Sequence, residues 1–461
     1  MNWQRKPLVK TSWALIIAFV LGIAYIQTIP TPSESGTEED PAGLVIARIQ
    51  AEYLLGVSSL MNAENRIAHQ AEILNTGTVD QRQRYMAFMI ALGDTQAATL
   101  SALHMKAQLE EAEIELTPEQ FVTQEQLDIL ASGGELPENH EPLELQLGWF
   151  GLLLQATPEE RETINASAER KILIVGSIFS LVCLLCLAGL VGLIVCFVRV
   201  LSGKLSTSMR PSQTSHGVYS EVFALWLFSF VALTAAGGLL AITIAKDDMF
   251  VEFLCVIGAL FASMFVLFWA RVRGISWEDI RCDIGWTSGA GVIKEMTFGI
   301  AGYAMMLPIL VAGILMTLLL VVLQQIGSGE PDPFAGTGGG SHPIIVEIAE
   351  GGWRVQVLLL AFAVIVAPIV EETMFRGVLY RHLRSAKKNL STIASIVCSV
   401  LLTSFLFASI HPQGWIAIPA LMGIAIGMNL MREWRGTLIP SMVVHGVSNG
   451  IVTSFMLVFL G

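Results

Sequence analysis

Long apolar runs alternate with short polar segments over most of the chain, and this alternation predicts membrane-spanning helices. A helix needs about 20 predominantly apolar residues to cross a bilayer. Nine segments come close to or meet this requirement: 12–30, 172–198, 220–245, 249–270, 295–324, 354–371, 393–410, 415–431 and 438–460. The pattern therefore predicts an all-α polytopic membrane protein, a helical bundle of about nine spans.

The first apolar segment has two interpretations. It follows Arg5, Lys6 and Lys10, which is typical of a secretory signal peptide. However, the segment is long and lacks a clear A-x-A cleavage site, so we expect residues 1–30 to be an uncleaved membrane anchor.

Residues 31–170 differ from the rest of the chain and separate the first two spans. They begin with the turn-rich stretch TPSESGTEEDP and continue with apolar residues at helical spacing. Thr117-Pro118-Glu119 and Thr157-Pro158-Glu159 resemble helix starts with proline just inside the helix. We expect an inserted helical domain to which no chemistry is assigned, a docking module for an unknown partner. His104 and the run from Glu110 to Glu115 are interpreted as a solvated helix face.

Composition and charge support this division. Of the 461 residues, 53% are hydrophobic and 14% are charged, whereas about 25% of residues are charged in soluble proteins. The chain has 39 acidic and 27 basic residues, of which 24 and 7 lie in 31–170, leaving 15 and 20 elsewhere. An acidic domain is thus joined to a mildly basic membrane part. Basic patches with interleaved aromatic residues are missing from the sequence, which argues against nucleic acid as a partner.

The basic residues of the short loops predict the orientation, because such residues remain on the cytoplasmic side. Alternating spans bring all of these basic segments to one side of the membrane: the amino terminus, 199–210, 271–281, 381–388 and Arg432 with Arg435. We therefore expect an integral protein of a bacterial inner membrane, with a cytoplasmic amino terminus and an extracytoplasmic domain at 31–170.

The six cysteines all fall in or beside predicted spans, so they form no disulfide framework and no metal-binding knuckle. Cys183 and Cys186 have the spacing of a CxxC motif, but within a lipid-embedded helix they are interpreted as small apolar residues.

Ionisable residues inside spans are costly, about 2.5–3.5 kcal/mol each on insertion scales, and they usually have a function. The sixth span ends in VAPIVEETMFRGVLYRHL. Glu372 and Arg376 are four residues apart and can pair on one helix face, which leaves Glu371 free to point into a cavity and accept a proton from water. The alternative is a juxtamembrane charge cluster.

Two further spans contribute polar residues. The seventh contains TSFLFASIHP, in which Phe407 and His411 share a face, and the ninth contains GTLIPSMVVHGVSNG, in which His445 and Asn449 lie one turn apart. Neighbouring donors inside the membrane are able to stabilise an oxyanion, whereas hydrogen bonding between helices is the competing explanation.

The motifs EETMFRG, FASIH and HGVSN occur in this order and resemble the EExxxR, FxxxH and HxxxN motifs of the CPBP intramembrane proteases. This family includes the CAAX prenyl protease of eukaryotes and the bacterial Abi proteins. The resemblance is strong over residues 354–461, the expected catalytic core, and over 171–353 it rests on the pattern of spans alone. It implies an eight-span protease core from residue 172.

The resemblance also implies roles for single residues and a metal-independent, glutamic-type endopeptidase without a cofactor. Glu371 with His411 would activate a water, Glu372 and Arg376 would support the site, and His445 and Asn449 would stabilise the oxyanion. The substrate would be a peptide or membrane protein within the lipid bilayer.

Three other functions could explain the same polar residues. Zinc bound by Glu, His and His is the minor one, since neither thiolates nor an HExxH pair are present. A non-catalytic membrane binding or assembly protein would use the same polar residues only to join helices. A transporter is disfavoured because the sequence has no internal repeat.

Straight spans raise a geometric problem for the predicted site. They would put Glu371 near the cytoplasmic boundary and His411 near the outer one, too far apart to share a water. Either a helix is therefore short, tilted or broken, with Pro368, Pro412 and Gly414 as candidate break points, or the topology differs from the predicted one at this place.

Overall fold

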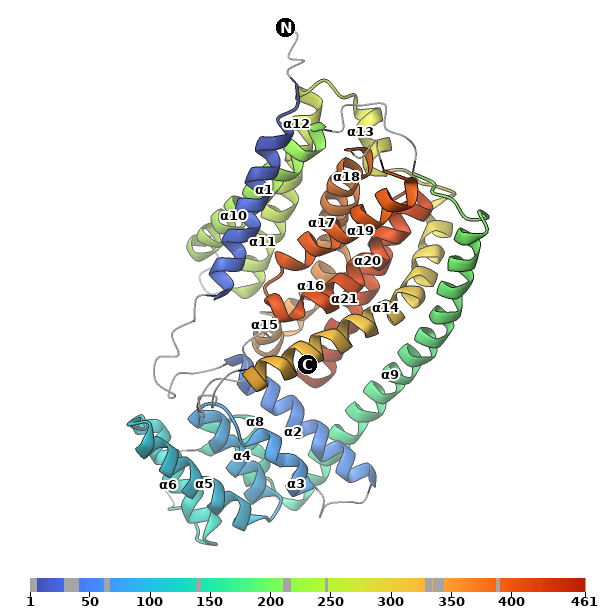
Figure 1. The fold of residues 1–461 in the computed structure, drawn as a ribbon. Helices are drawn as coiled ribbons and strands as arrows, with labels where there is room; N and C mark the ends of the chain where they lie inside the picture. Colours follow the sequence, from blue (N-terminus) through green and yellow to red (C-terminus); the bar gives the residue numbers. More distant parts are fainter. Residues whose placement is uncertain are drawn as a thin grey trace. The chain divides into compact units, whose positions relative to one another are not determined.

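A computed structural model describes residues 6–28, 41–61, 67–137, 142–209, 217–244, 248–327, 334, 344–386 and 390–460. Regular secondary structure in these residues is helical throughout, and they contain no strand (Figure 1). Ten of the helices are long and apolar enough to cross a membrane. The predicted fold class, an all-α polytopic membrane protein, is thereby confirmed.

Contacts between residues divide the chain into two compact units. Unit 1 consists of residues 1–29, 180–327 and 351–455, and unit 2 of residues 30–179, 328–350 and 456–461. Unit 1 contains most of the apolar helices and all of the candidate site residues, and each unit has its own hydrophobic core.

Unit 1 is a bundle of long helices. In it α10 packs against α1 and α11, and α20 lies between α14 and α19. Figure 1 shows α1 alongside α10. The helices with membrane-spanning length are α1 (Val9–Thr28), α9 (Pro158–Leu201, shared with unit 2), α10 (Gly217–Ile244), α11 with α12 (Met249–Ser263 and Leu267–Val272), α14 (Val292–Gly327), the helix from α16 to α18 (Trp353–Ala386), α19 (Thr392–Ser409), α20 (Ile418–Arg435) and α21 (Ile439–Leu460).

The nine predicted spans all correspond to helices, with two differences in extent. The predicted helix start at Thr157-Pro158 and the predicted span 172–198 belong to one continuous helix of 44 residues. The sixth span does not end at Glu371 but continues to Ala386. The tenth candidate, α2 (Pro41–Met61), lies in the segment that the sequence assigned to the acidic domain.

Buried ion pairs join the helices at one end of unit 1. Asp283 of α13 (Trp277–Ile284) accepts hydrogen bonds from Arg381 and from the Tyr219 hydroxyl. Glu433 accepts from Tyr380 at 2.7 Å and from both Arg384 Nε and Nη2 at 2.9 Å. We call this the basic end; its arginines are Arg273, Arg381, Arg384, Arg432 and Arg435. These charges also hold the helices together.

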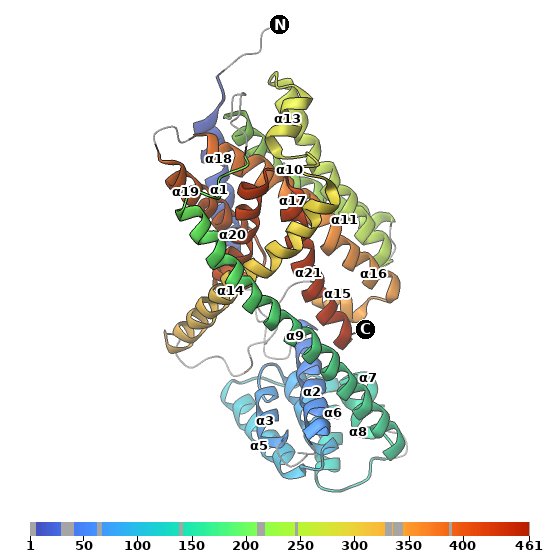
Figure 2. The same cartoon turned by 90° about the vertical axis from the view of Figure 1, so that its right-hand side faces the viewer.

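Unit 2 consists mainly of shorter helices (Figure 2). Its core includes Tyr85, Phe88 and Phe150. Thr117 forms a capping box with Gln120 at the start of α6, as its sequence pattern predicts. His104 is exposed on α5, which agrees with the predicted solvated face. The helices of unit 2 besides α2 and the start of α9 are α3 (Ile67–Ala71), α4 (Val79–Ala91), α5 (Thr95–Glu111), α6 (Pro118–Ala131), α7 (Leu143–Leu147), α8 (Trp149–Gln155) and α15 (Ile344–Glu350).

Candidate active site

The helix Trp353–Ala386 places Glu371 and Glu372 near its middle. It is α-helical over α16 (Trp353–Ala361), α17 (Ala367–Glu372) and α18 (Tyr380–Ala386), with π-helical segments at Phe362–Val366 and Thr373–Leu379 on either side of α17. A π segment has a wider turn than an α-helix and is frequent at functional sites. The two glutamates therefore lie between two local distortions of one continuous helix.

The continuation of this helix removes the predicted difference in depth. Glu371 lies 15 positions before Ala386, where its helix ends. Phe407 lies 15 positions after Thr392, where α19 begins. Since both helices rise about 1.5 Å per residue from the same connection, Glu371 lies level with Phe407 and about one turn from His411. The prediction that Glu371 lies near the cytoplasmic boundary was wrong, because the apolar pattern ends at Glu371 but the helix does not.

Pro368 does not break the helix, but it removes one main-chain donor. Proline has no N–H, so the carbonyl of Val364, four residues earlier, cannot accept the usual α-helical hydrogen bond from residue 368. Gly446 of α21 packs against this oxygen so closely that a Cβ atom at residue 446 would lie 2.5 Å from it. The approach of α21 to the glutamate helix at this point therefore requires glycine.

Glu372 is the centre of a buried cluster. Its Oε1 accepts a hydrogen bond from Arg376 Nη1 at 2.9 Å and contacts His445 Nδ1 at 2.9 Å. The side chains of Glu372 and Arg376 are completely buried. The predicted pairing of these two residues is present, and the pair in turn orients the imidazole of His445.

Glu371 points in a different direction and is not part of this pair. Its side chain keeps 25% of its exposure, and its Oε2 lies 3.8 Å from His445 Nε2. Its Oε2 atom is itself buried and, among the described residues, has no hydrogen-bond partner. Glu371 is thus the partly exposed glutamate of the cluster and points away from the Glu372–Arg376 pair, as the divergence of neighbouring helix positions predicts.

His411 lies just beyond the end of α19 and is fixed by main-chain contacts. Its Nδ1 lies 2.6 Å from the Phe407 carbonyl oxygen, and its own carbonyl accepts a hydrogen bond from Gln27 Nε2 of α1 at 2.9 Å. His411 is close enough to Glu371, His445 and Arg376 to interact with them electrostatically. The structure therefore brings His411 near Glu371 and His445.

Phe407 is the apolar contact that these groups share. The centre of its ring lies 4.3 Å from that of His411 and 5.9 Å from that of His445, and the Arg376 guanidinium stacks on it at 4.5 Å. Cations are attracted to the face of an aromatic ring. Phe407 thereby holds Arg376 and both imidazoles in position without supplying a polar group.

Asn449 makes a hydrogen bond that joins two helices. Its Nδ2 donates to the carbonyl oxygen of Ala363, in the first π segment, at 2.9 Å. One of its two amide hydrogens is therefore used to join α21 to the glutamate helix. This contact corresponds to the alternative role predicted from the sequence, hydrogen bonding between helices. The other amide hydrogen is not used by this bond.

The hydrogen-bond partners determine which imidazole nitrogens carry hydrogen. A carbonyl or an ionised carboxylate only accepts, so Nδ1 is the donor in both His411 and His445. A neutral imidazole then has its lone pair on Nε2. Both histidines are consequently able to accept a proton at Nε2, and in His445 this atom faces Glu371.

A metal-binding arrangement is not found in the part of the chain that the structure describes. No group of three His, Cys, Asp or Glu side chains is placed there to hold a metal ion. Cys183, Cys186 and the four other cysteines are free thiols.

Several contacts of the site were not anticipated. Gln27 on α1 and the main-chain oxygens of Ala363 and Val364 take part, although none was a candidate residue. Pro368 does indicate that the Val364 carbonyl lacks its usual α-helical donor, and Gln27 is a polar residue in an apolar segment. Neither feature identifies its partner, because the partners are distant in sequence.

Comparisons with known proteins agree with the position of the site. The family described as "Type II CAAX prenyl endopeptidase Rce1-like" matches residues 353–451. The chain is 29% identical over 100 residues to a protein of Staphylococcus aureus (strain USA300), "Membrane-embedded CAAX protease MroQ". This match covers 22% of the chain and 40% of the length of that protein. No solved structure matches.

Proposed function

We propose that this integral membrane protein is an intramembrane endopeptidase of the glutamic type, because its residues 353–451 match the Rce1-like CAAX prenyl endopeptidase family and a membrane-embedded CAAX protease. Glu371 is the general base, and His411 is its partner in activating water. Glu372 and Arg376 are positioning residues, and His445 with Asn449 stabilises the oxyanion. The comparisons support membrane proteolysis, and these individual roles are our proposal.

One observation carries the proposal: the difference between the two neighbouring glutamates. Glu372 is buried and paired with Arg376, whereas Glu371 is partly exposed and faces His445 Nε2 at 3.8 Å. A purely structural carboxylate pair inside a membrane would be expected to have both members neutralised. A partly exposed glutamate that has, in the described part of the chain, no ion-pair partner of its own except a nearby imidazole suits proton transfer from water.

The first step is the attack of water on the substrate carbonyl. Glu371 takes one proton from the water, while the lone pair on His411 Nε2 accepts a hydrogen bond from the second water hydrogen. The oxygen of the water forms a bond to the carbonyl carbon, and the carbonyl oxygen becomes an oxyanion. His411 can orient the water in this way because its Nδ1 is already bound to the Phe407 carbonyl.

The oxyanion is stabilised from α21. For this role His445 takes up a proton at Nε2 from solvent before the attack and keeps it throughout. It then donates from Nδ1 to Glu372 and from Nε2 to the oxyanion, and Asn449 supplies its second amide hydrogen. The ion pair of Glu372 with Arg376 keeps the first of these bonds in place. Glu371 then returns its proton to the departing amine nitrogen, the C–N bond breaks, and the carboxyl group of the product is formed.

The substrate class follows from the location of the site. Glu371 lies within a span, so the cleaved bond belongs to a peptide or membrane protein that reaches the site from the bilayer. We place the protein in a bacterial inner membrane with its amino terminus in the cytoplasm, and we assign to residues 31–170 the binding of a partner outside it.

A second candidate function is a non-catalytic assembly protein. The observation that favours it is the hydrogen bond from Asn449 to Ala363, because this contact joins helices and needs no substrate. The two functions differ in their dependence on Glu371. Assembly tolerates the neutral isostere Glu371→Gln, whereas general base catalysis does not.

The proposal is tested by comparing membranes from cells that express the wild type, Glu371→Ala or Glu371→Gln. We expect the cleavage of at least one membrane protein to disappear in both variants, since loss of a general base lowers rates by about 10²–10⁴-fold. Quantitative mass spectrometry of new peptide ends measures this loss.

The matched control is Glu278→Ala, which removes an exposed carboxylate of α13 and should leave cleavage unchanged. Cleavage that persists in Glu371→Gln contradicts the glutamic mechanism. Cleavage that depends on Glu371 but stops on treatment with a chelator, and returns with zinc, favours the zinc alternative.

A further inference from the structure

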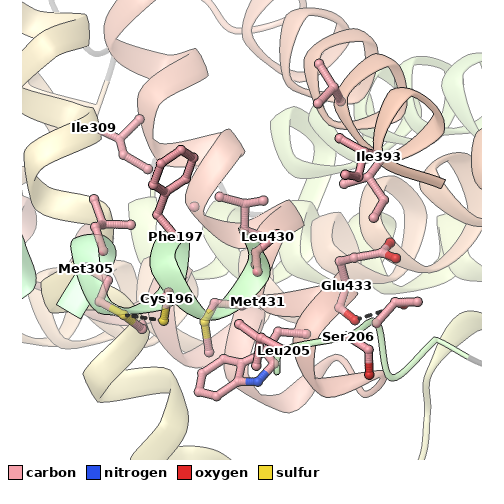
Figure 3. A pocket seen from close by; sticks show the side chains of 18 of the residues that line it. Cys196, Phe197, Leu205, Ser206, Met305, Ile309, Ile393, Leu430, Met431 and Glu433 are labelled. Atoms are coloured by element: carbon pink, nitrogen blue, oxygen red, sulfur yellow. Dashed lines mark hydrogen bonds between the residues drawn. The ribbon is translucent and has the colours of Figure 1, made fainter. Parts of the chain in front are cut away.

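A large apolar crevice lies on unit 1 (Figure 3), and none of the proposed catalytic residues lines it. Its volume is about 640 Å³, which is in the range of pockets that bind small molecules. Its floor is formed by α14 and α20, and its walls by α9 and α19. The lining includes Cys196 and Phe197 on α9, Met305 and Ile309 on α14, Ile393 on α19, and Leu430 on α20.

The crevice is continuous with the lipid-facing surface of the bundle. Phe197 on one wall is 64% exposed and Ile393 on the other is 65% exposed, and both belong to helices of membrane-spanning length. Apolar side chains that are exposed at this depth are in contact with the acyl chains of the bilayer. The same acyl chains therefore have direct access to the crevice from the side.

One end of the crevice is polar and lies in the loop after α9. Gly203, Leu205, Ser206 and Thr207 line this end. The Thr207 hydroxyl donates to the main-chain oxygen of Glu433 at 3.4 Å, which anchors the loop to α20. The crevice is thus apolar along most of its length and ends in hydroxyl groups at the basic end of unit 1.

The charges at this end favour an anionic group. Arg199 and Lys204 adjoin the lining residues Val200, Gly203 and Leu205 in the chain, and both are exposed. The one acidic residue of the lining, Glu433, is already neutralised by Arg384 at 2.9 Å. Basic residues beside a membrane attract anionic lipids.

We infer that the crevice between α9 and α19 binds one acyl chain of an anionic membrane phospholipid, with the phosphate beside Arg199 and Lys204. The chain fills the apolar length of the crevice, and the hydroxyl groups of Ser206 and Thr207 lie near the glycerol end. Two of its four helices, α9 and α14, lie outside the part of the chain that matches the protease family. The site is separate from Glu371 and does not rest on the proposed catalytic activity.

A native cysteine makes the site testable. Cys196 lines the crevice, next to Met305, whereas Cys183 lies on the same helix, is exposed and does not line it. In variants that retain only one of these two cysteines, we would measure the rate of reaction with a small membrane-permeant maleimide. The full chain would be placed in bilayer discs of phosphatidylcholine alone or of phosphatidylcholine mixed equally with phosphatidylglycerol.

We expect phosphatidylglycerol to slow the reaction of Cys196 at least about fivefold and to leave that of Cys183 unchanged. Replacement of both basic residues, Arg199→Gln with Lys204→Gln, should abolish the difference between the two lipid mixtures. Equal rates for Cys196 in the two mixtures would overturn the inference, because the anionic group would then have no binding site at this end.

A second measurement maps the acyl chain directly. Phosphatidylglycerol with a photoreactive group on its acyl chain should label peptides from the crevice, and Leu430→Trp, which fills the crevice, should remove this labelling. Leu401→Trp on the outer face of α19 is the matched control, since Leu401 is 47% exposed and does not line the crevice.

Two outcomes of the mapping would contradict the inference. One is labelling of α9 and α19 that is unaffected by Leu430→Trp, which indicates general lipid contact. The other is protection of Cys196 by a prenylated peptide but not by phosphatidylglycerol, which indicates a substrate site. If Leu430→Trp does not fold, the cysteine measurement still tests whether phosphatidylglycerol occupies the crevice, because it does not depend on that variant.

Discussion

Gly446 is the single residue on which the contact between α21 and the glutamate helix most clearly depends. A Cβ atom there would lie 2.5 Å from the Val364 carbonyl oxygen, which is main chain and cannot rotate away. Gly446→Ala should therefore push α21 outward and displace the adjacent His445. A shift of about 1 Å at a catalytic group can cost about 100-fold in rate, so we expect a loss of that order in the Glu371-dependent cleavage.

Gly450, one turn further along α21, provides the matched control. A Cβ atom there would meet the Val364 side chain at 3.2 Å, and this methyl group can move by a few tenths of an ångström. Gly450→Ala should keep most of the cleavage activity. Equal activity of the two variants, each with wild-type thermal stability in detergent, would mean that close packing at Gly446 does not position His445.

At the same scale, the sequence predicts local pairs better than distant ones. The pairing of Glu372 with Arg376 follows from their separation of four residues on one helix, and it is present. The contact of His445 with Glu372 joins residues 73 positions apart. Spacing within α21 says which residues share a face but not which carbonyl or carboxylate that face meets. For this reason Asn449 was predicted as an oxyanion donor, and its bond to Ala363 was foreseen only as a general type of contact.

At the scale of elements, hydropathy predicts where spans lie but not where helices end. The predicted sixth span stopped at Glu371 because charged residues follow it. The helix continues through them because Glu372 and Arg376 neutralise each other and Tyr380 pairs with Glu433. A hydropathy average counts these residues as polar, although inside the bundle their charges are satisfied. The apparent difference in depth between Glu371 and His411 arose from this error.

The amino-terminal helix α1 has a larger role than that of an anchor. Trp13 Nε1 donates to His382 at 3.1 Å, and Gln27 Nε2 donates to the main-chain oxygen of His411 at 2.9 Å. A hydrogen bond of this kind contributes about 0.5–1.5 kcal/mol. Gln27→Leu, which keeps the size but removes the donor, should lower the kcat of Glu371-dependent cleavage roughly 2- to 10-fold, with little change in KM.

The control for Gln27 is Leu21→Ala, on an exposed part of the same helix. It should leave kcat unchanged. If Gln27→Leu alters KM alone, or alters the amount of folded protein and not kcat, then α1 does not position His411 for catalysis and its contact is structural only.

At the scale of the whole molecule, charge separates the chain into regions more sharply than hydropathy does. The acidic stretch 31–170 and the mildly basic remainder were distinguished by counting alone. Unit 2, as the structure defines it, also includes residues 328–350 and 456–461, which no count assigns to it. Those additions depend on tertiary contacts, such as the bond from Lys171 Nζ to the Phe459 carbonyl at 3.1 Å. Because Lys171 also pairs with Glu52 at 2.6 Å, one partly buried ammonium group connects three distant segments.

The distribution of basic residues also predicts the orientation of the molecule in the membrane. Basic residues of short loops are retained in the cytoplasm, and native Cys282 is exposed on α13 beside Arg281. In a variant with Cys282 as the only cysteine, a membrane-impermeant maleimide should fail to react in right-side-out vesicles and should react in inverted ones. A single cysteine introduced by Ser132→Cys, at an exposed site of unit 2, should behave in the opposite way. Reaction of both cysteines from the same side would contradict the nine-span topology, because that topology places three spans, α9, α10 and α11 with α12, between residues 132 and 282.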